Sequence, residues 1–276
     1  MSELRGKRAL VTGASSGIGA AIARDLAARG TNLVLTARRK EQLEAVAAEC
    51  RAAGVTVDVI TADLGAPGAV ATLWDAAVAG GSIDICINNA GFGYFRPFGE
   101  VEASREAELV QLNITSLVEL SRRWVAGRTG GTGAGRRYLM NIASIGAYQS
   151  VPNMALYAAS KAFVRNFTEA LHDELARTES SATCICPGGT ETEFHAQAGA
   201  GNYGWVANAS MMSAEACAKR SVVAMLKRRR TYIPGLINKL SCFGVRFVPR
   251  RFASWMAQRV LGKPRPGALP ERSIAA

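Results

Sequence analysis

Tyr157 and Lys161 form the first pair of residues whose types and spacing suggest chemistry. They lie four apart in the stretch ALYAASKAFV, which lacks Gly and Pro and is typical of a helix. Residues at this spacing share one helical face, so we expect the phenol and the ammonium to be neighbours. A free phenol has a pKa of about 10, and a nearby cation lowers that pKa by favouring the phenolate. The pair could exchange a proton with a bound oxygen, although an amphipathic helix with a surface pair would be the better explanation of the spacing taken alone.

Ser144 offers a hydroxyl that could hold such an oxygen. It ends the apolar stretch RRYLMNIAS, residues 136–144, which predicts a buried strand. In a parallel sheet the carboxyl ends of the strands meet at one edge, where ligands bind. We therefore expect Ser144 to lie at the same edge as the start of the Tyr157 helix.

A phosphate site is predicted in TGASSGIG, residues 12–19, between a strand and a helix. Gly13, Gly17 and Gly19 let the backbone turn tightly and approach a ligand closely. The N–H groups at the start of the following helix favour a pyrophosphate. The spacing G-x-x-x-G-x-G differs from the common dinucleotide pattern, and a glycine-rich turn that binds nothing is the alternative. The position of the motif between a strand and a helix favours the phosphate site.

The end of the second predicted strand, LTARRK, indicates which dinucleotide is preferred. NAD sites usually place an acid here for the ribose 2′-hydroxyl, but this chain has Ala37 followed by Arg38, Arg39 and Lys40. Cations suit a 2′-phosphate, so we expect NADP rather than NAD, with Arg38 as the main contact. Asp63, at the end of the third strand, is predicted either to accept a bond from the adenine amino group or to cap a helix.

Strands and helices alternate along most of the chain with short connections, which predicts a doubly wound parallel α/β sheet. We expect a Rossmann-like domain over residues 1–230 and a basic amphipathic C-terminal extension over residues 231–276. The expected strands are 7–13, 32–37, 55–64, 83–91, 136–144 and 181–189. The expected helices are 17–30, 40–54, 66–79, 103–126 and 155–178. Residues 127–135 are expected to form a glycine-rich surface loop.

Composition and charge narrow the class of protein. The 276 residues, 49% of them hydrophobic, suit a large buried core. The N-terminus has no apolar stretch typical of a secretory signal, no run is long enough to span a membrane, and the six cysteines are scattered. We therefore expect a cytoplasmic protein with reduced, mostly buried thiols. Two histidines are too few to suggest a metal site, so none is expected.

The net charge of +11 is concentrated near the C-terminus. Residues 1–218 hold 19 Lys and Arg against 21 Asp and Glu, whereas residues 219–265 hold 13 basic residues and no acid. Leu236, Leu240, Phe243 and Phe247 would share one helical stripe in this segment. Such a stripe with basic flanks suits a membrane surface, a subunit contact or a lid over a pocket, and nucleic acid is not expected as a partner.

Six motifs together resemble those of the short-chain dehydrogenase/reductase family over residues 5–230. In order they are TGASSGIG, NNAG (88–91), Asn113 in LNITS, Ser144, YAASK (157–161) and PGGTET (187–192). The resemblance implies an NADP(H)-linked oxidoreductase with a catalytic tetrad of Asn113, Ser144, Tyr157 and Lys161. Tyr157 would be the acid/base, Ser144 would orient the substrate oxygen, Lys161 would bind the nicotinamide ribose and lower the Tyr157 pKa, and Asn113 would hold a relay water.

The resemblance also implies the residues that contact the cofactor and a homodimer or homotetramer packed through the Tyr157 helix. Some NADP-binding relatives carry a basic residue where this chain has Ser16, which leaves the 2′-phosphate to Arg38 and Arg39. The expected cofactor residues are Gly13, Ser15, Ser16, Gly17, Ile18, Gly19, Arg38, Arg39, Asp63, Leu64, Asn89, Ala90, Gly91, Tyr157, Lys161, Pro187, Gly188, Thr190 and Thr192.

Two aromatic stretches after strand ends, residues 92–99 and 193–205, are predicted to flank the substrate, although packing against helices would explain each residue equally well. They contain Phe92, Tyr94, Phe95, Phe98, Phe194, Tyr203 and Trp205. We expect a small hydrophobic ketone or secondary alcohol as substrate. The alternatives are reduction of a carrier-bound 3-oxoacyl chain and a non-catalytic NADP(H)-binding protein at a membrane surface.

Overall fold

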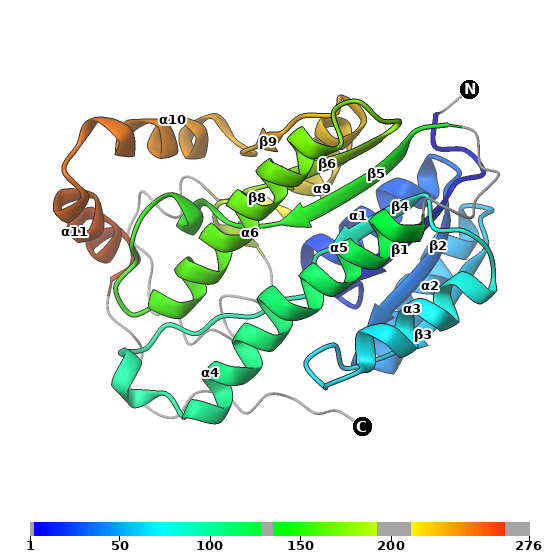
Figure 1. The fold of residues 1–276 in the computed structure, drawn as a ribbon, viewed down its shortest axis with the longest axis horizontal. Coiled ribbons are helices and arrows are strands. Elements are labelled where there is room, and N and C mark those ends of the chain that lie inside the picture. Colours follow the sequence, from blue (N-terminus) through cyan, green and yellow to red (C-terminus); the bar gives the residue numbers. More distant parts are fainter. Residues whose placement is uncertain (1–2, 128–134, 192–210, 263–276) are drawn as a thin grey trace.

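Seven parallel strands form the central sheet of the computed structural model, which describes residues 3–127, 135–191 and 211–262 (Figure 1). Their order is β3-β2-β1-β4-β5-β6-β9. The strands are β1 (Arg8–Thr12), β2 (Asn32–Ala37), β3 (Val57–Thr61), β4 (Ile85–Asn88), β5 (Arg137–Ile142), β6 (Ser180–Ile185) and β9 (Thr231–Tyr232). The predicted doubly wound sheet is confirmed, with one strand more than the sequence indicated.

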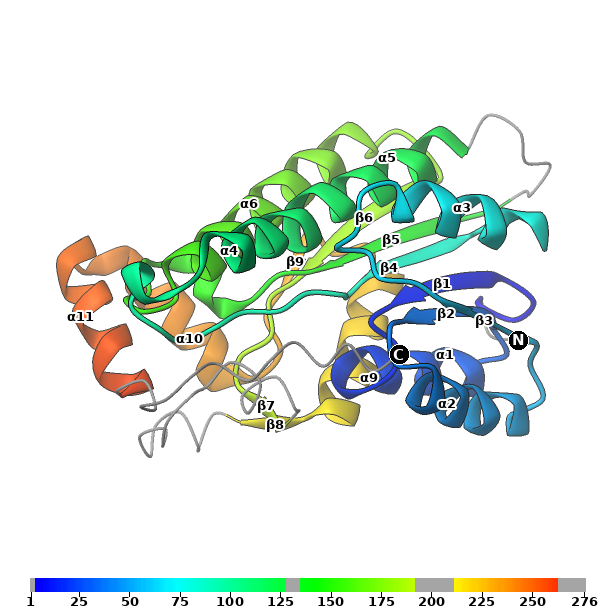
Figure 2. The same ribbon diagram turned by 90° about the horizontal axis from the view of Figure 1, so that it is seen from below.

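Helices cover both faces of this sheet, as Figure 2 shows. On one face lie α1 (Gly17–Ala28), α2 (Lys40–Ala52) and α9 (Ala214–Leu226). On the other lie α3 (Ala69–Ala79), α5 (Leu117–Ala126) and α6 (Ala155–Glu174). Successive strand residues point to opposite faces, so Ala9 and Val11 pack on the α1 side while Leu10 packs on the α3 side. Both faces are therefore buried, which explains the nearly continuous apolar strands.

The expected helix 103–126 is one continuous helical segment whose middle is wider than an α-helix. It consists of α4 (Ala103–Val110), a π-helical stretch at Gln111–Ser116, and α5. Such stretches are rare and often occur at functional sites. This one contains Asn113, the expected tetrad residue.

Four helix ends differ from the sequence prediction. The helices expected over residues 17–30 and 40–54 end at Ala28 and Ala52. The helix expected from residue 66 begins at Ala69, because Gly68 before it has a left-handed φ of 77° that a helix does not accommodate. The helix expected to reach residue 178 ends at Glu174. The expected glycine-rich loop lies mostly outside the described residues.

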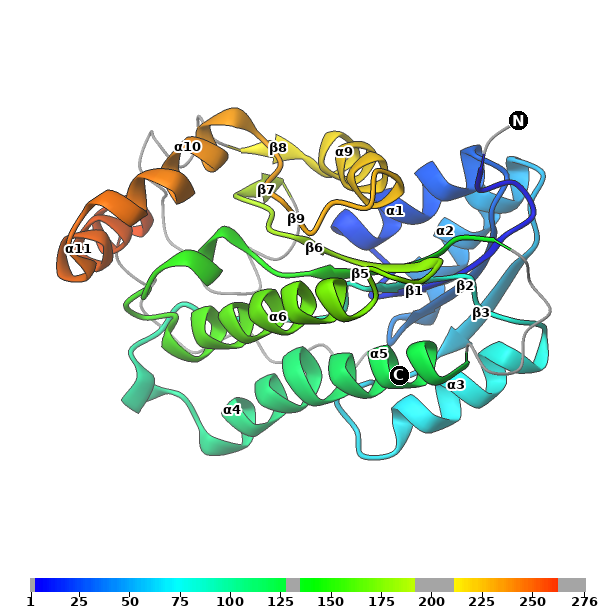
Figure 3. The same cartoon turned by 45° about the horizontal axis from the view of Figure 1, so that its top comes forward.

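The segment after α9 begins inside the sheet, because β9 pairs with β6 immediately after the predicted boundary at residue 230. It continues through α10 (Leu236–Gly244), a 3-10 turn (Val245–Phe247) and α11 (Arg250–Leu261). These helices lie at one end of the molecule, away from β1–β3 (Figure 3). A small parallel pair, β7 (Thr190–Glu191) and β8 (Met212–Ser213), lies against α9. None of the helices described here is both long and apolar enough to cross a membrane.

A chain of buried polar side chains ties β4 and β5 to the helices above them. The Asn88 amide donates to Ser121 Oγ on α5 at 3.0 Å and to Asn141 Oδ1 on β5 at 2.8 Å. Asn141 Nδ2 in turn donates to Thr168 Oγ1 on α6 at 2.9 Å. Asn88, Ser121, Asn141 and Thr168 are all at most 3% exposed, so these bonds replace water that cannot reach them.

Replacing Asn141 with Ala should destabilise the fold, because Asn88 and Thr168 would both lose a buried partner. We expect a loss of about 2–4 kcal/mol in the free energy of unfolding, measured by urea denaturation. Asn166→Ala, at an exposed position on α6, is the matched control and should change stability by less than about 0.5 kcal/mol. Equal changes in unfolding free energy for the two variants would contradict the stabilising role of these buried hydrogen bonds.

Candidate active site

A cavity of about 720 Å³ opens at the carboxyl ends of the strands. It extends from the glycine turn after β1 to α10 and α11 at the far end. The predicted residues that line it are Gly13, Ser15, Ser16, Gly17, Ile18, Arg38, Arg39, Asp63, Leu64, Asn89, Ala90, Gly91, Ser144, Tyr157, Lys161, Pro187, Gly188 and Thr190. Gly19 and Asn113 do not line the cavity, and Thr192 lies outside the described residues.

The glycine turn is held against the end of β4 by close backbone contact. Asn89 Nδ2 donates to the carbonyl oxygens of Thr12 and Gly13 at 3.0 and 3.1 Å. A Cβ atom added at Gly13 would lie 2.9 Å from Asn89 Nδ2, and one at Gly19 would lie 2.2 Å from Gly13 O. Gly19 is therefore needed for packing behind the turn rather than for lining the cavity.

Thr12 is a positioning residue that the sequence analysis missed. Its Oγ1 accepts from the backbone N–H groups of Asn89 and Ala90, both at 3.0 Å, and donates to Ile87 O at 3.2 Å. This hydroxyl fixes the NNAG turn against the glycine turn. Its place directly before the first glycine was the available signal, but Thr at a strand end is common and indicates nothing by itself.

Arg39 brings a positive charge to the glycine turn. Its Nη2 donates to Ser16 Oγ at 2.9 Å and to Ser15 Oγ at 3.4 Å. Arg38 lines the same part of the cavity, while Lys40 is exposed and does not line it. The guanidinium of Arg39, which follows β2, thus lies beside the serines of the glycine turn.

Asp63 forms a local turn at the adenine end of the predicted site. Its Oδ1 accepts the Gly65 N–H at 2.9 Å. The alternative that Asp63 caps the third helix is wrong, because the residue before α3 is Gly68. Asp63 and Leu64 both line the cavity, and the Leu64 carbonyl accepts from Ser116 Oγ at 2.6 Å.

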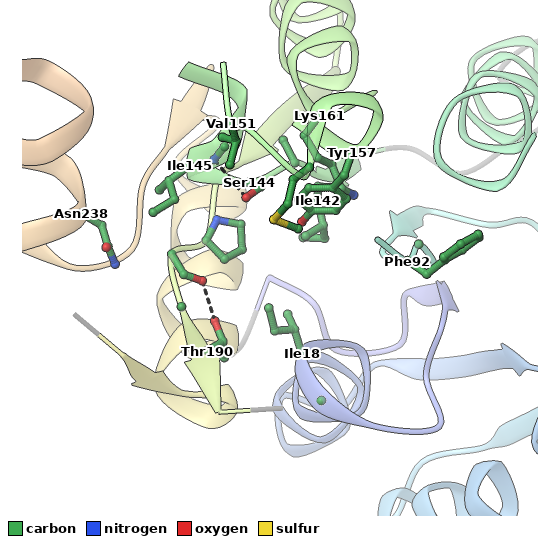
Figure 4. A pocket seen from close by; sticks show the side chains of 18 of the residues that line it. Ile18, Phe92, Ile142, Ser144, Ile145, Val151, Tyr157, Lys161, Thr190 and Asn238 are labelled. Atoms are coloured by element: carbon green, nitrogen blue, oxygen red, sulfur yellow. Dashed lines mark hydrogen bonds between the residues drawn. The ribbon is translucent and has the colours of Figure 1, made fainter. Parts of the chain in front are cut away.

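Tyr157, Lys161 and Ser144 lie together on the wall of the cavity, opposite Ile18 and Thr190 (Figure 4). A Cβ atom added at Gly146 would lie 3.5 Å from Ser144 Oγ and 4.0 Å from Tyr157 Cε1, so both side chains adjoin the same point. The Ser144 hydroxyl accepts the Gly146 N–H at 3.1 Å, which fixes its direction.

Lys161 is almost completely buried behind Tyr157, with 5% of its surface exposed. Its Nζ donates to the Ile142 carbonyl at 3.0 Å and lies 5.8 Å from the centre of the Tyr157 ring. Burial lowers the pKa of the amine from its ordinary 10.5 to about 8. The amine thus remains mostly protonated at neutral pH and places a cation beside the phenol.

Asn113 lies just behind this wall. Its Oδ1 accepts the Phe92 N–H at 3.1 Å, and its Nδ2 donates to Phe92 O at 2.9 Å and to Ser160 Oγ at 3.2 Å. A Cβ atom added at Gly91 would lie 2.9 Å from Asn113 Oδ1 and 3.4 Å from Lys161 Nζ. Asn113 therefore joins the loop after β4 to α6 near the lysine, and its expected role in holding a water stays a prediction.

The wall at the substrate end is mostly apolar, and only part of it was predicted. Phe92 and Phe95 line the cavity, whereas Tyr94 is buried outside it and Phe98 is exposed. Phe194, Tyr203 and Trp205 lie outside the described residues. Further lining residues come from the 3-10 turn and loop before α6, from α10 and α11, and from the 3-10 turn between these two helices. They include Tyr148, Val151, Met154, Ile237, Val245, Phe252 and Met256. A lid over a pocket was one of the roles expected for the C-terminal segment.

The parallel sheet, the glycine turn and the Tyr157 wall define an α/β protein of the dinucleotide-binding class. A family model described as short chain dehydrogenase matches residues 7–202. A candidate ketoacyl reductase of Streptomyces coelicolor is 40% identical over 194 residues, covering 68% of this chain and 72% of that protein. The chain belongs to the short-chain dehydrogenase/reductase family, and it is an oxidoreductase of that family.

Solved structures show the same fold over most of the chain. A short-chain dehydrogenase from Sphingobium yanoikuyae in complex with NADPH has a TM-score of 0.76 and 31% identity, covering 87% of this chain and 94% of that one. A 3-ketoacyl-(acyl-carrier-protein) reductase from Brucella melitensis complexed with NADH has a TM-score of 0.71 and 26% identity, covering 84% of this chain and 98% of that one.

The difference in unfolding free energy between wild type and the Lys161→Met variant should depend on pH, because burial of the Lys161 charge destabilises the wild-type fold. Below pH 8 the amine is protonated in both states, so the wild-type fold bears the full cost of burial. As pH rises further, the unfolded chain binds more protons than the fold, and wild type gains stability. We expect the difference in unfolding free energy to shift toward wild type by on the order of 2–3 kcal/mol between about pH 7 and pH 10.

Urea denaturation at several pH values measures this shift. Lys239→Met, at an exposed position on α10, is the matched control and should give a difference that does not vary with pH. A flat difference for Lys161→Met as well would show that the buried amine keeps an ordinary pKa.

Proposed function

We propose that the protein is an NADP(H)-dependent carbonyl reductase or alcohol dehydrogenase acting on a hydrophobic ketone or secondary alcohol. The observation that carries the proposal is the single cavity that joins a glycine turn flanked by Arg38 and Arg39 to the wall of Ser144, Tyr157 and Lys161. A dinucleotide needs a phosphate site at one end and an acid/base group at the other, and this cavity supplies both.

The residues of the turn fit a dinucleotide. Gly13 and Gly19 let the turn pack tightly on itself and on Asn89, where a Cβ atom would clash, and Gly13 and Gly17 line the cavity. The N-terminus of α1 points its free N–H groups toward the turn, which suits a pyrophosphate. Arg38 and Arg39 would hold a 2′-phosphate, Asp63 and Leu64 would lie by the adenine, and Asn89, Ala90 and Gly91 by the adenosine. Pro187, Gly188 and Thr190 would lie by the nicotinamide.

The reaction requires a proton to move to or from the substrate oxygen, and we assign that step to Tyr157. In the direction of reduction, the phenolic Oη gives its proton to the carbonyl oxygen while Ser144 Oγ holds that oxygen by a hydrogen bond. The protonated Lys161 amine, in its buried position, stabilises the phenolate that remains. The nicotinamide supplies the hydride when it is bound. In the direction of oxidation Tyr157 takes the proton back.

The substrate is proposed from the lining of the cavity beyond this wall. Phe92, Phe95, Val151, Met154 and Ile237 give that end an apolar surface, which favours burial of hydrocarbon. A polar or charged substrate would leave unpaired groups there. This supports a hydrophobic carbonyl compound or alcohol.

Reduction of a carrier-bound 3-oxoacyl chain is a second candidate, favoured by the ketoacyl reductases among the relatives. Its chemistry uses the same Ser144, Tyr157 and Lys161. Turnover of a carrier-linked 3-oxoacyl substrate but not of its free thioester would favour this candidate over the first.

We also propose a homo-oligomer and a cytoplasmic location. The oligomer is supported by Phe163 on α6, which is exposed and stacks on Phe167 with ring centres 5.9 Å apart. An apolar side chain at the surface of this helix suits a contact between subunits. The number of subunits stays a prediction that sedimentation velocity can check.

Tyr157→Phe should abolish turnover and leave cofactor binding intact. Removal of the acid/base hydroxyl is expected to lower kcat by a factor of at least about 100 in an assay of NADPH oxidation with a panel of apolar ketones. The rise in melting temperature caused by NADPH should be retained, since the ring still packs in place. Tyr94→Phe, outside the cavity, is the matched control and should keep full activity. Wild-type protein that binds NADPH but reduces no carbonyl would instead indicate the non-catalytic alternative.

Arg38→Ala and Arg39→Ala should weaken NADPH and spare NADH. Loss of a charge-assisted bond to the 2′-phosphate is expected to raise the KM for NADPH about 10- to 100-fold. The KM for NADH should change by less than about threefold, because NADH has no phosphate at that position. Lys40→Ala, from the same basic run but outside the cavity, should have little effect on either cofactor. Equal losses for both cofactors would contradict the proposed preference.

A further inference from the structure

The outward faces of α10, the turn after it and α11 carry large apolar side chains. Eight of the twelve exposed large hydrophobic residues in the described part of the chain lie here, between 41% and 73% exposed. They are Leu236, Ile237, Leu240, Phe243, Phe247, Phe252, Trp255 and Met256. The ring centres of Phe243 and Phe247 are 5.1 Å apart, and those of Phe252 and Trp255 are 5.6 Å apart, so each pair of rings is in contact. These eight side chains all come from the segment Leu236–Met256, and we call them the α10–α11 surface.

The inward faces of the same helices carry small or polar residues. Asn238 and Cys242 of α10 and Ala253 and Ala257 of α11 are 3–6% exposed. Asn238 Nδ2 donates to Pro234 O at 3.2 Å, and a Cβ atom added at Gly188 would lie 2.3 Å from that nitrogen. An amphipathic helix that is stabilised by its own domain buries its largest apolar residues. In α10 and α11 the largest apolar residues are exposed instead, so the outward face offers an apolar surface for contact with something outside this domain.

Exposed cations accompany these apolar side chains along the same segment. Lys239, Arg246, Arg250, Arg251 and Arg259 are all exposed, and residues 231–262 contain no Asp or Glu. No ion pair joins any of these five side chains to a carboxylate of the described residues. The surface therefore presents bulky apolar groups together with uncompensated cations.

We propose that the α10–α11 surface docks on an anionic membrane, with its apolar side chains at the acyl boundary and its cations among the headgroups. A helix with a large apolar face, aromatic residues and basic flanks binds in this way. Each cation near such a surface adds favourable electrostatic attraction. The proposal does not rest on the proposed function, because the docking residues Leu236, Leu240, Phe243, Phe247 and Trp255 do not line the cavity.

A second copy of the chain fits this surface less well. A symmetric contact would bring the same patch of each subunit together, and with it two sets of five cations and no acid. Like charges placed opposite each other in an interface disfavour association. An anionic lipid surface instead satisfies the apolar and the basic groups together.

Docking would also place one end of the cavity next to lipid. Ile237, Phe252 and Met256 are partly exposed on the α10–α11 surface and also line the cavity. A hydrophobic compound dissolved in the membrane would then reach the apolar end of the cavity without crossing water.

Co-sedimentation with vesicles tests the proposal, using the full chain without cofactor. We expect it to pellet with phosphatidylcholine vesicles that contain about one quarter phosphatidylglycerol. It should stay in solution with phosphatidylcholine alone, and salt of about 0.5 M should release most of the bound protein. Wild-type protein that remains in the supernatant with anionic vesicles would overturn the proposal.

The combined variant Leu240→Ser, Phe243→Ser and Phe247→Ser should lower the partition into anionic vesicles at least about tenfold. Phe98→Ser, at an equally exposed position before α4, is the matched control and should bind as wild type does. A triple variant that pellets as well as wild type would contradict the docking face. The surface would instead bind a second copy of the chain if two results occur together. Wild type would bind no vesicles, and the triple variant would change from dimer to monomer in sedimentation velocity.

If the triple variant does not fold, a variant that removes positive charge can test membrane docking in its place. Lys239→Gln, Arg250→Gln and Arg251→Gln together leave the apolar residues in place. This variant should bind anionic vesicles more weakly and depend less on salt. Unchanged binding and salt dependence would show that the cations do not face lipid.

Discussion

A single buried ammonium group organises the catalytic end of the cavity. Lys161 is held at the top of β5 by its bond to the Ile142 carbonyl, and little room remains around it, since Gly91 allows no side chain there. Burying a charge is costly, and the lowered pKa of about 8 is one expression of that cost. The fold bears this cost at a position beside Tyr157, where the cation would favour the phenolate form of that side chain. The proton transfer that we propose for Tyr157 and the local loss of stability would therefore have the same physical cause.

The parallel sheet explains how residues so far apart in the sequence reach this point. All of its strands run in one direction, so the segments after β1, β2, β3, β4, β5 and β6 emerge at one edge. The buried contacts of Asn88 with Asn141, and of Thr12 with the NNAG turn, fix neighbouring strand ends relative to each other. These contacts position the segments that line the cavity from the glycine turn to Ser144.

Sequence patterns predicted what depends on local periodicity and on recognisable motifs. The order of strands and helices, the glycine turn and the placing of Ser144, Tyr157 and Lys161 on one cavity wall could all be predicted, because each follows from a run of apolar residues or from spacing. The two-residue strand β9 could not, since it is too short to show alternation and lies in a basic run. Thr12 and the contact between Arg39 and Ser16 were also missed. They depend on the distance between segments that only the assembled sheet brings together.

The C-terminal helices show where a local pattern leaves the partner undefined. The apolar stripe of α10 was visible in the sequence, but a stripe alone does not say which phase it faces. The structure separates the two faces of the helix: Asn238 and Cys242 are buried, while Leu240 and Phe243 are 60% and 55% exposed. The inward residues of α10 are small or polar, so the opposite orientation of this helix would bury Leu240 and Phe243 and expose less apolar surface. The structure does not adopt that orientation. Asn238 packs closely against Gly188, and both residues line the cavity, so the inward face of α10 is fitted to the body of the protein while its large apolar residues lie outward.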